Sequence, residues 1–322
     1  MTLSEFYRAI IEEGRKTDLR SAEIIDDELL RWQDKFDKLD DADKALFDAD
    51  KLFNPYADTR LLQGTGDEEL TSLMIGIDID AGEIAVADRL RQKGQTVDLV
   101  VSHHPSSHAW ANLHDVMRMQ VDIIHQLGVP IAAAEDLMDG RIKQVERRLL
   151  PANHTRAADA AALLDIPLLC VHTPADNHVT AYLQEILDKE QPKRLSHILD
   201  LLLVEPEYQD ATRRGVGPRI VLGNKDRRTG KVFVDMTGGT SGAKDVFEKL
   251  ANGGVDTIVG MHISDDYRKE AKKHHLNVII AGHISSDTIG MNLLLDSLEK
   301  RQGSPFMVHN CSGFKRHSRT IN

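Results

Sequence analysis

The sequence predicts an α/β protein whose largely parallel sheets are covered by helices on both faces. Short apolar segments rich in Val, Ile and Leu alternate with longer amphipathic segments from residue 61 onwards. Near-continuous apolar strands of this kind are typical of parallel sheets that are buried on both sides. A second observation is that the sequences at two predicted strand ends are similar. A third is that the N-terminal region lacks the alternation of strands and helices.

Residues 1–60 are predicted to form a helical extension. Leu3, Phe6 and Ile10 recur at the spacing of one helix face, and a second apolar face follows at residues 24–36. An apolar stripe of this width requires a partner surface. We therefore expect an acidic helical arm that packs on the body of the chain or contributes to subunit contacts.

The alternating region contains predicted strands separated by helices. The strands are expected at residues 73–79, 97–102, 129–134, 167–172, 219–223, 231–236, 256–261 and 277–282. The helices between them are expected at residues 83–93, 114–127, 178–190, 241–252 and 264–275. In folds of this class, the loops at the carboxyl ends of the strands build the functional site.

Two strand ends resemble each other closely enough to indicate an internal duplication. Residues 97–108 align without gaps with residues 276–287, which matches His104 with His283. We interpret this match as a repeated strand–helix–strand unit, in which the two strands inside these segments hold equivalent places. The predicted parts of the chain are a helical arm at 1–60, a first α/β domain at 61–175 and a second at 176–322.

Composition limits the possible function classes. The net charge of -11 argues against a nucleic-acid surface, which needs a basic stripe. The N-terminus lacks a secretory signal and no segment has the length of a membrane span, so we expect a cytoplasmic protein without membrane partners. Cys170 and Cys311 are far apart and support no cysteine-built zinc site. Any metal here needs histidine and carboxylate ligands.

Adjacent histidines end the strand predicted at 97–102. His103 and His104 are followed by Pro105, which ends the strand and leaves both imidazole rings free to diverge. A histidine pair at a buried strand end needs partners, and the commonest are a hydrogen-bonding neighbour and a metal. Two diverging rings can serve two metal ions. The alternative is a pair of hydrogen-bonded, half-exposed histidines.

Two other predicted strands also end in potential metal ligands. Glu135 and Asp139 follow the strand predicted at 129–134, and His283 and Asp287 follow the last predicted strand. Carboxylate oxygens and imidazole nitrogens are ligands for divalent metals. The alternative for the acidic residues is a helix start at which negative charges complement the helix dipole.

Together these strand ends hold the ligands of a two-metal centre, which activates water for hydrolysis. Zinc, iron and manganese all suit a mixture of imidazole and carboxylate ligands, so we expect two divalent metal ions per chain. Asp78 and Asp80 are expected to orient the ligands by hydrogen bonds from outside the centre. His172 stands at another strand end and is a weaker candidate ligand.

The pattern resembles the GTP cyclohydrolase I type 2 homologue family, also called the Nif-three-like family, across residues 53–316. In that family one strand ends in His-His, a later one runs into a His-Thr-Asn-Leu-Asp-like segment, and a third ends in Gly-His followed four residues later by Glu. The matching residues here are His103, His104, Asp139 at the end of "EDLMD", and Gly282 with His283. Glu135 stands at the family's middle histidine and Asp287 at its glutamate.

The resemblance implies two similar, intertwined α/β/α three-layer domains, a dinuclear centre between them and a homohexamer. The metal ligands that it implies are His103, His104, Asp139, His283 and Asp287. The leading hypothesis is a metal-dependent hydrolase that uses a metal-activated water on a small molecule, such as a nucleotide or another phosphoester.

Two other functions stay open at this point. One is a phosphoesterase of the Asp-His-His type, in which an aspartate directly precedes the histidine pair, where this chain has Ser102. The other is a non-catalytic metal-binding scaffold oligomer. Open coordination positions would distinguish a catalytic metal centre from a structural one.

Overall fold

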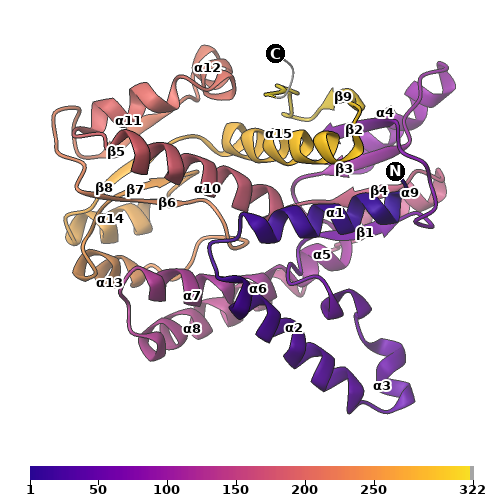
Figure 1. The fold of residues 1–322 in the computed structure, drawn as a ribbon, viewed down its shortest axis with the longest axis horizontal. Coiled ribbons are helices and arrows are strands. Elements are labelled where there is room, and N and C mark those ends of the chain that lie inside the picture. Colours follow the sequence, from indigo (N-terminus) through magenta and orange to yellow (C-terminus); the bar gives the residue numbers. More distant parts are fainter. Residues whose placement is uncertain (320–322) are drawn as a thin grey trace.

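The computed structural model describes residues 1–319 and contains two β-sheets side by side (Figure 1). The strand order of the larger sheet is β1 (Arg60–Gln63), β4 (Leu168–Cys170), β3 (Leu99–Ser102), β2 (Ser72–Gly76) and β9 (Met307–Cys311). The order of the smaller sheet is β5 (Arg219–Leu222), β8 (Asn277–Ile280), β7 (Val255–Gly260) and β6 (Lys231–Asp235). β1 and β5 are antiparallel to their neighbours, and all other pairs are parallel.

Each sheet is covered by helices on both faces, as the sequence predicts. On the larger sheet, Val100 packs under α4 (Ala81–Gln92) and α9 (Arg156–Leu163), whereas its neighbours Leu99 and Val101 face α1 (Leu3–Lys16) and α15 (His283–Gln302). The smaller sheet lies between two groups of helices. They are α10 (Thr173–Glu190), α11 (Leu195–Leu202) and α12 (Pro206–Arg213) on one face, and α13 (Val246–Asn252) and α14 (Asp265–Lys273) on the other. The α/β fold with two similar domains is confirmed.

The strand predicted at 129–134 is wrong, because these residues lie at the start of a helix. The segment between β3 and β4 folds into α5 (Ser107–Ala111), α6 (Leu113–Val116), α7 (Met119–Gln126) and α8 (Ile131–Leu149). Ala134, Met138 and Ile142 are buried at the spacing of one helix face, so the helical period continues past the predicted strand. The other predicted strands are observed with shifted bounds and most of them are shorter, and β1 and β9 are additional.

Two long helices carry the chain from one sheet to the other. α10 follows β4 of the larger sheet and leads towards β5, whereas α15 follows β8 of the smaller sheet and leads back to β9. They begin near the middle of the molecule and run in opposite directions (Figure 1). Gly290 permits their close contact, because a Cβ atom there would lie 2.3 Å from the carbonyl oxygen of Ala175. The predicted domain boundary at 175/176 falls inside α10.

The strand orders correct the predicted duplication. Counted from the antiparallel edge strand, β4, β3 and β2 correspond to β8, β7 and β6. The predicted equivalence of the strands at 97–102 and 277–282, now β3 and β8, is therefore wrong. β3 corresponds to β7, so the counterpart of His104 is His262.

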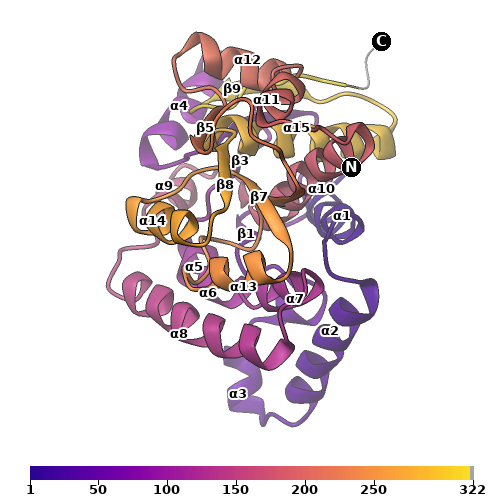
Figure 2. The same ribbon diagram turned by 90° about the vertical axis from the view of Figure 1, so that its left-hand side faces the viewer.

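The N-terminal region divides into a core helix and a projecting pair. Leu3, Phe6 and Ile10 of α1 are buried against the body of the chain. α2 (Ala22–Asp37) and α3 (Asp41–Leu46) project away from the sheets (Figures 1 and 2), and a short 3-10 helix at Ala49–Leu52 follows them. Leu30 is 64% exposed and Leu46 is 87% exposed. The predicted arm therefore corresponds to α2 and α3, whereas α1 belongs to the core.

The C-terminal segment is fastened to the body by ion pairs. Arg316 Nη2 lies 2.6 Å from Asp296 Oδ1, and Arg319 Nη2 lies 2.6 Å from Glu205 Oε2.

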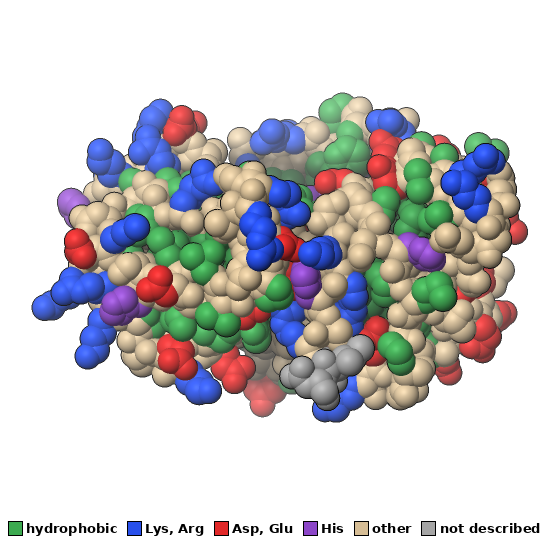
Figure 3. Space-filling view, turned by 90° about the horizontal axis from the view of Figure 1, so that it is seen from above, with side chains coloured by type: hydrophobic (Ala, Val, Ile, Leu, Met, Phe, Trp, Pro, Cys, Tyr) green, Lys and Arg blue, Asp and Glu red, His purple; other side chains and the backbone are tan. Residues whose placement is uncertain are grey.

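On the face seen in Figure 3, Lys and Arg side chains are interspersed with Asp and Glu side chains. Across the described residues, no helix has the length and apolarity needed to span a membrane.

Candidate metal centre

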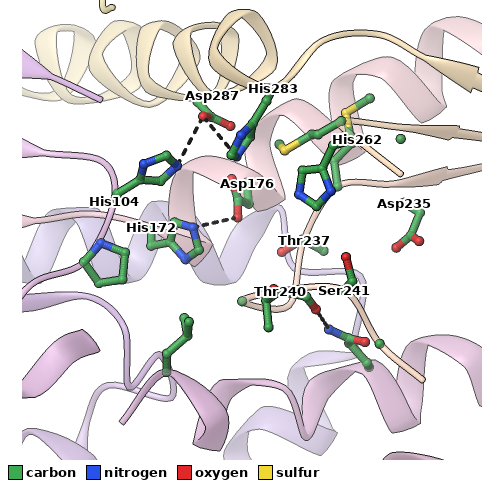
Figure 4. Close-up of a pocket in the computed structure, with 18 of the residues that line it drawn as sticks. His104, His172, Asp176, Asp235, Thr237, Thr240, Ser241, His262, His283 and Asp287 are labelled. Atoms are coloured by element: carbon green, nitrogen blue, oxygen red, sulfur yellow. Dashed lines mark hydrogen bonds and ion pairs between the residues drawn. The ribbon is translucent and has the colours of Figure 1, made fainter. Parts of the chain in front are cut away.

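Six side chains with metal-binding atoms come together where β3 ends and where α10 and α15 begin. Their Nε2, Nδ1 or carboxylate oxygen atoms form three overlapping groups, in each of which the atoms lie within 4.8 Å of one another. The groups are His103, His104 and His172; His104, His283 and Asp287; and His103, Asp176 and Asp287. Figure 4 shows five of the six converging on one end of a cavity.

Asp287 lies at the centre of this cluster. Its side chain is fully buried, and its two oxygens face different histidines. Oδ1 is 3.6 Å from His103 Nε2, whereas Oδ2 is 3.5 Å from His104 Nε2 and 3.6 Å from His283 Nε2. A carboxylate with one oxygen on each side has the disposition of a bridge between two ions.

Asp176 and His172 complete the side of the cluster that α10 provides. Asp176 Oδ1 lies 3.5 Å from His103 Nε2, and Asp176 Oδ2 lies 3.8 Å from His172 Nε2. His172 and Asp176 are four residues apart, as are His283 and Asp287. The equivalent strands β4 and β8 therefore each lead into a His-x-x-x-Asp segment at the start of a long helix.

The histidines are oriented by hydrogen bonds from outside the cluster. His103 Nδ1 donates to the carbonyl oxygen of Val171 at 3.0 Å, and His104 Nδ1 lies 2.7 Å from Asp78 Oδ1. With the proton held on Nδ1, the Nε2 lone pair of each ring points into the cluster. Asp78 thus has the orienting position expected from the sequence, whereas Asp80 caps α4 and pairs with Arg156.

His172 is held by a buried carboxylate. Its Nδ1 lies 2.8 Å from Asp58 Oδ2, and the same oxygen accepts a hydrogen bond from Thr173 Oγ1 at 2.7 Å. Burial by itself would raise the pKa of Asp58, but these hydrogen bonds outweigh it and the pKa is lowered. Asp58 is therefore an ionised acceptor that fixes the orientation of the His172 ring.

Burial and charge set the protonation of the cluster. Burial lowers the pKa of His103 to about 4, so this ring is neutral at pH 7. Burial alone would lower the pKa of His104, but Asp287 and Asp78 raise it to about 8. The pKa of Asp176 is raised by burial and by the negative charge of Asp287. Against its burial, the neighbouring imidazoles of His103, His104 and His283 hold the pKa of Asp287 well below its usual range.

Several atoms in the cluster are buried without a hydrogen-bond partner among the described residues. They are His103 Nε2, Asp176 Oδ1 and both carboxylate oxygens of Asp287. Each unsatisfied buried polar group costs about 1–3 kcal/mol. Nitrogen lone pairs and carboxylate oxygens that converge in this way fit a divalent cation better than any hydrogen-bond donor in the chain.

The structure does not bring Asp139 to this cluster. Asp139 lies on the exposed face of α8, where its Oδ2 is 2.7 Å from Lys143 Nζ, and Glu135 is exposed on the same helix. Neither residue lies in the cluster, because the segment predicted as a strand before them is helical. The sequence pointed to His172 only as a weaker candidate and not to Asp176, although both stand in "HTPAD", which has His first and Asp fifth as the family segment does. The family's pattern was therefore present in the sequence at "HTPAD", whereas "EDLMD" matches that pattern only in part.

A cavity of about 830 Å³ opens beside the cluster. His104, His172 and Asp287 line one end, and Figure 4 shows His262 and then Asp235 further along the wall. The loop at 237–242 lines the same cavity, and Figure 4 shows its Thr237, Thr240 and Ser241 below His262. A concave site that joins potential metal ligands to a mixed polar and apolar wall is typical of a small-molecule binding site.

The chain is similar in sequence and structure to a NIF3 superfamily protein from Sphaerobacter thermophilus, with 30% identity, coverage of 80% of this chain and 91% of that chain, and a TM-score of 0.68. It matches reduced HcgD from Methanocaldococcus jannaschii at 17% identity, over 78% of this chain and 87% of that chain, with a TM-score of 0.46. A protein from Thermus thermophilus matches at 19% identity, over 88% of this chain and 96% of that chain, with a TM-score of 0.46. No protein-family model and no curated protein matches the chain.

Proposed function

The chain belongs to the NIF3 superfamily, and from this premise we propose that it is a metal-dependent hydrolase of a small molecule. The residues proposed to hold two divalent ions are His103, His104, His172, Asp176, His283 and Asp287. The observation that carries the proposal is the set of buried, unpartnered nitrogen and oxygen atoms that converge there. When bound, the ions supply Lewis acidity that lowers the pKa of water and polarises the substrate.

The protein's own residues prepare this chemistry. Val171, Asp78 and Asp58 hold the Nδ1 atoms of three histidines and thereby direct their Nε2 atoms inwards. His283, by contrast, is exposed to the cavity at 40% of its side-chain surface. The cavity gives a substrate access to the cluster, which favours a catalytic centre over a purely structural one.

The Asp-His-His phosphoesterase is the weaker alternative. Ser102 occupies the position that would need a metal-binding aspartate, and its hydroxyl donates to the carbonyl oxygen of His104 at 2.6 Å. This residue therefore brings no carboxylate to the cluster. A different carboxylate, Asp287, lies beside the histidine pair.

Metal analysis combined with a hydrolysis assay tests the proposal. We expect up to two zinc, iron or manganese ions per purified chain, and loss of metal in the His104→Ala His283→Ala double variant. The exposed Asp139→Asn variant is the matched control and should keep its metal. The metal-loaded protein should hydrolyse at least one member of a panel of phosphoesters, nucleotides and amides, and chelation should stop the reaction. Unchanged metal content in the double variant would refute the proposed site.

We also propose that the protein is a cytoplasmic homo-oligomer in which α2 and α3 contribute contacts between subunits. We propose a hexamer because the resemblance to the Nif-three-like family implies one. The exposed Leu30 and Leu46 support this part of the proposal. Light scattering of the full chain should give a hexamer, and a Leu30→Glu Leu46→Glu variant should shift it to smaller species. A monomeric full chain would contradict the assembly, and an unaltered hexamer in the variant would contradict the role of these helices.

A further inference from the structure

Asp235 is an unpartnered carboxylate that faces the cavity. It ends β6, and among the described residues its side chain makes neither a hydrogen bond nor an ion pair. Water inside the cavity reaches it, while the protein around the cavity raises its pKa to about 6. In Figure 4 it lies beyond His262, on the side away from Asp287. A carboxylate that faces the cavity without a protein partner is open to a hydrogen-bond donor on a bound molecule.

The charged residues of the cavity wall are mostly acidic. The acidic side chains are Asp78, Asp80, Glu83, Asp176, Asp235 and Asp287. Arg156 is the one Lys or Arg side chain on the described wall, and its Nη2 lies 2.9 Å from Asp80 Oδ2. Among the described residues that line the cavity, no unpaired Lys or Arg is therefore available to bind a phosphate or carboxylate group beside Asp235.

The rest of the wall near Asp235 combines apolar side chains with a polar loop that is held in place. Phe233, Met236 and Met261 line it together with the loop at 237–242. Gln120 Nε2 donates to the carbonyl oxygens of Gly238 at 2.6 Å and Thr240 at 2.7 Å. Tyr267 fastens the same loop by donating to the carbonyl oxygen of Gly242 at 2.6 Å. This end of the cavity is thus a preformed pocket for an apolar body with one polar group.

We propose that the cavity binds a small molecule that has an apolar body and a cationic nitrogen group, an amine or an amidine, which donates hydrogen bonds to Asp235. The other end of the molecule faces the metal centre. This inference rests on the proposed function, because it takes the cavity beside the centre as the substrate site. A bound cation keeps Asp235 ionised and forms charge-assisted hydrogen bonds with it.

Calorimetric titration with benzamidine, and with benzoate as its anionic match, tests the inference on the metal-loaded protein. Benzamidine should bind the wild type in the millimolar range or tighter and lose about 10- to 100-fold in affinity in Asp235→Asn. Benzoate binding should not weaken in this variant. Benzamidine affinity should also fall as the pH drops below 6, because Asp235 takes up a proton.

Three results would overturn the inference. They are no benzamidine binding by the wild type, equal benzamidine affinity in Asp235→Asn, and a loss of benzoate affinity that matches the loss for benzamidine. Metal content separates this failure from failure of the proposed function. Asp235→Asn with wild-type metal content but unchanged benzamidine affinity overturns the inference alone, whereas a wild type without metal refutes the proposed centre independently of Asp235.

Discussion

The starts of α10 and α15 carry the same His-x-x-x-Asp pair in two different settings. His172 is 9% exposed and its Nδ1 is held by the buried Asp58, whereas His283 is 40% exposed and faces the cavity. Asp176 contacts two histidines of the cluster and Asp287 contacts three. The two halves of the structural repeat therefore differ. In the α10 half the histidine is held by a buried carboxylate, whereas the α15 half has the histidine that is exposed to the cavity and the aspartate that contacts three histidines.

Replacing each of the two aspartates in turn should have the largest effect. Asp287→Asn removes the carboxylate that faces His103, His104 and His283, so we expect loss of both metal ions. Asp176→Asn removes contacts on one side only, so we expect loss of one ion. Elemental analysis of both variants beside the wild type measures the difference. Equal metal loss in the two variants would show that Asp287 is not shared.

Disrupting the contact between α10 and α15 should lower the free energy of unfolding of both domains. In Gly290→Ala a Cβ atom would lie 2.3 Å from the carbonyl oxygen of Ala175, so the helices must separate, at a cost of about 1–3 kcal/mol. Gly140→Ala is the control, because its Cβ meets nothing within 4 Å and alanine favours a helix by up to about 1 kcal/mol. Urea unfolding should show opposite signs for the two variants. A Gly290→Ala protein as stable as the wild type would contradict the close contact.

Replacing Asp58, the carboxylate that holds His172 from outside the cluster, should weaken metal binding without abolishing it. In Asp58→Asn the His172 ring loses its ionised acceptor, so we expect affinity for one ion to fall by about 10- to 100-fold. Competition with a chelator measures this change. The Asp139→Asn control should match the wild type. If Asp58→Asn binds both ions as tightly as the wild type, His172 does not depend on its surroundings in the way described.

The smallest effect is expected far from the ligands, at Asp235. Asp235 is exposed to the cavity, but the protein that surrounds the cavity raises its pKa from 3.8 to about 6, so the folded state favours the protonated form and the ionised form opposes folding above pH 6. In metal-free protein, Asp235→Asn should therefore melt at a higher temperature than the wild type well above pH 6, and the difference should shrink as the pH falls towards 4. A variant that melts lower at high pH would contradict this environment for Asp235.

The fold was largely predictable because local patterns and burial agree along most of the chain. Apolar runs such as those around Val100 and Ile279 are buried on both faces of a sheet and could be recognised without neighbours. Residues 131–134 could not, because a short run of small apolar residues suits a strand and a helix equally well. β1 and β9 were also missed, because their pairing depends on strands distant in sequence.

The candidate site was predictable where a histidine directly follows a strand. His103, His104 and His283 lie in the cluster together with Asp287. Asp139 does not, since its predicted position depended on a strand that is a helix. The equivalence of β8 with β4 required the order of strands in both sheets, whereas His172 and Asp176 had a sequence signal in "HTPAD" that the strand predicted before Asp139 obscured. The gapless match of residues 97–108 with residues 276–287 instead aligned the ends of β3 and β8, which both contribute to the cluster.

In the proposed metal centre, Asp287 would be shared by two metal ions held between the starts of α10 and α15. Anomalous diffraction at the absorption edge of the bound metal, from crystals of the metal-loaded protein, tests it most directly. We predict two peaks per chain, one beside His104 and His283 and one beside His103 and Asp176, each within bonding distance of a different oxygen of Asp287. No peak at this position, or a single peak that leaves one Asp287 oxygen without a metal, would contradict the claim.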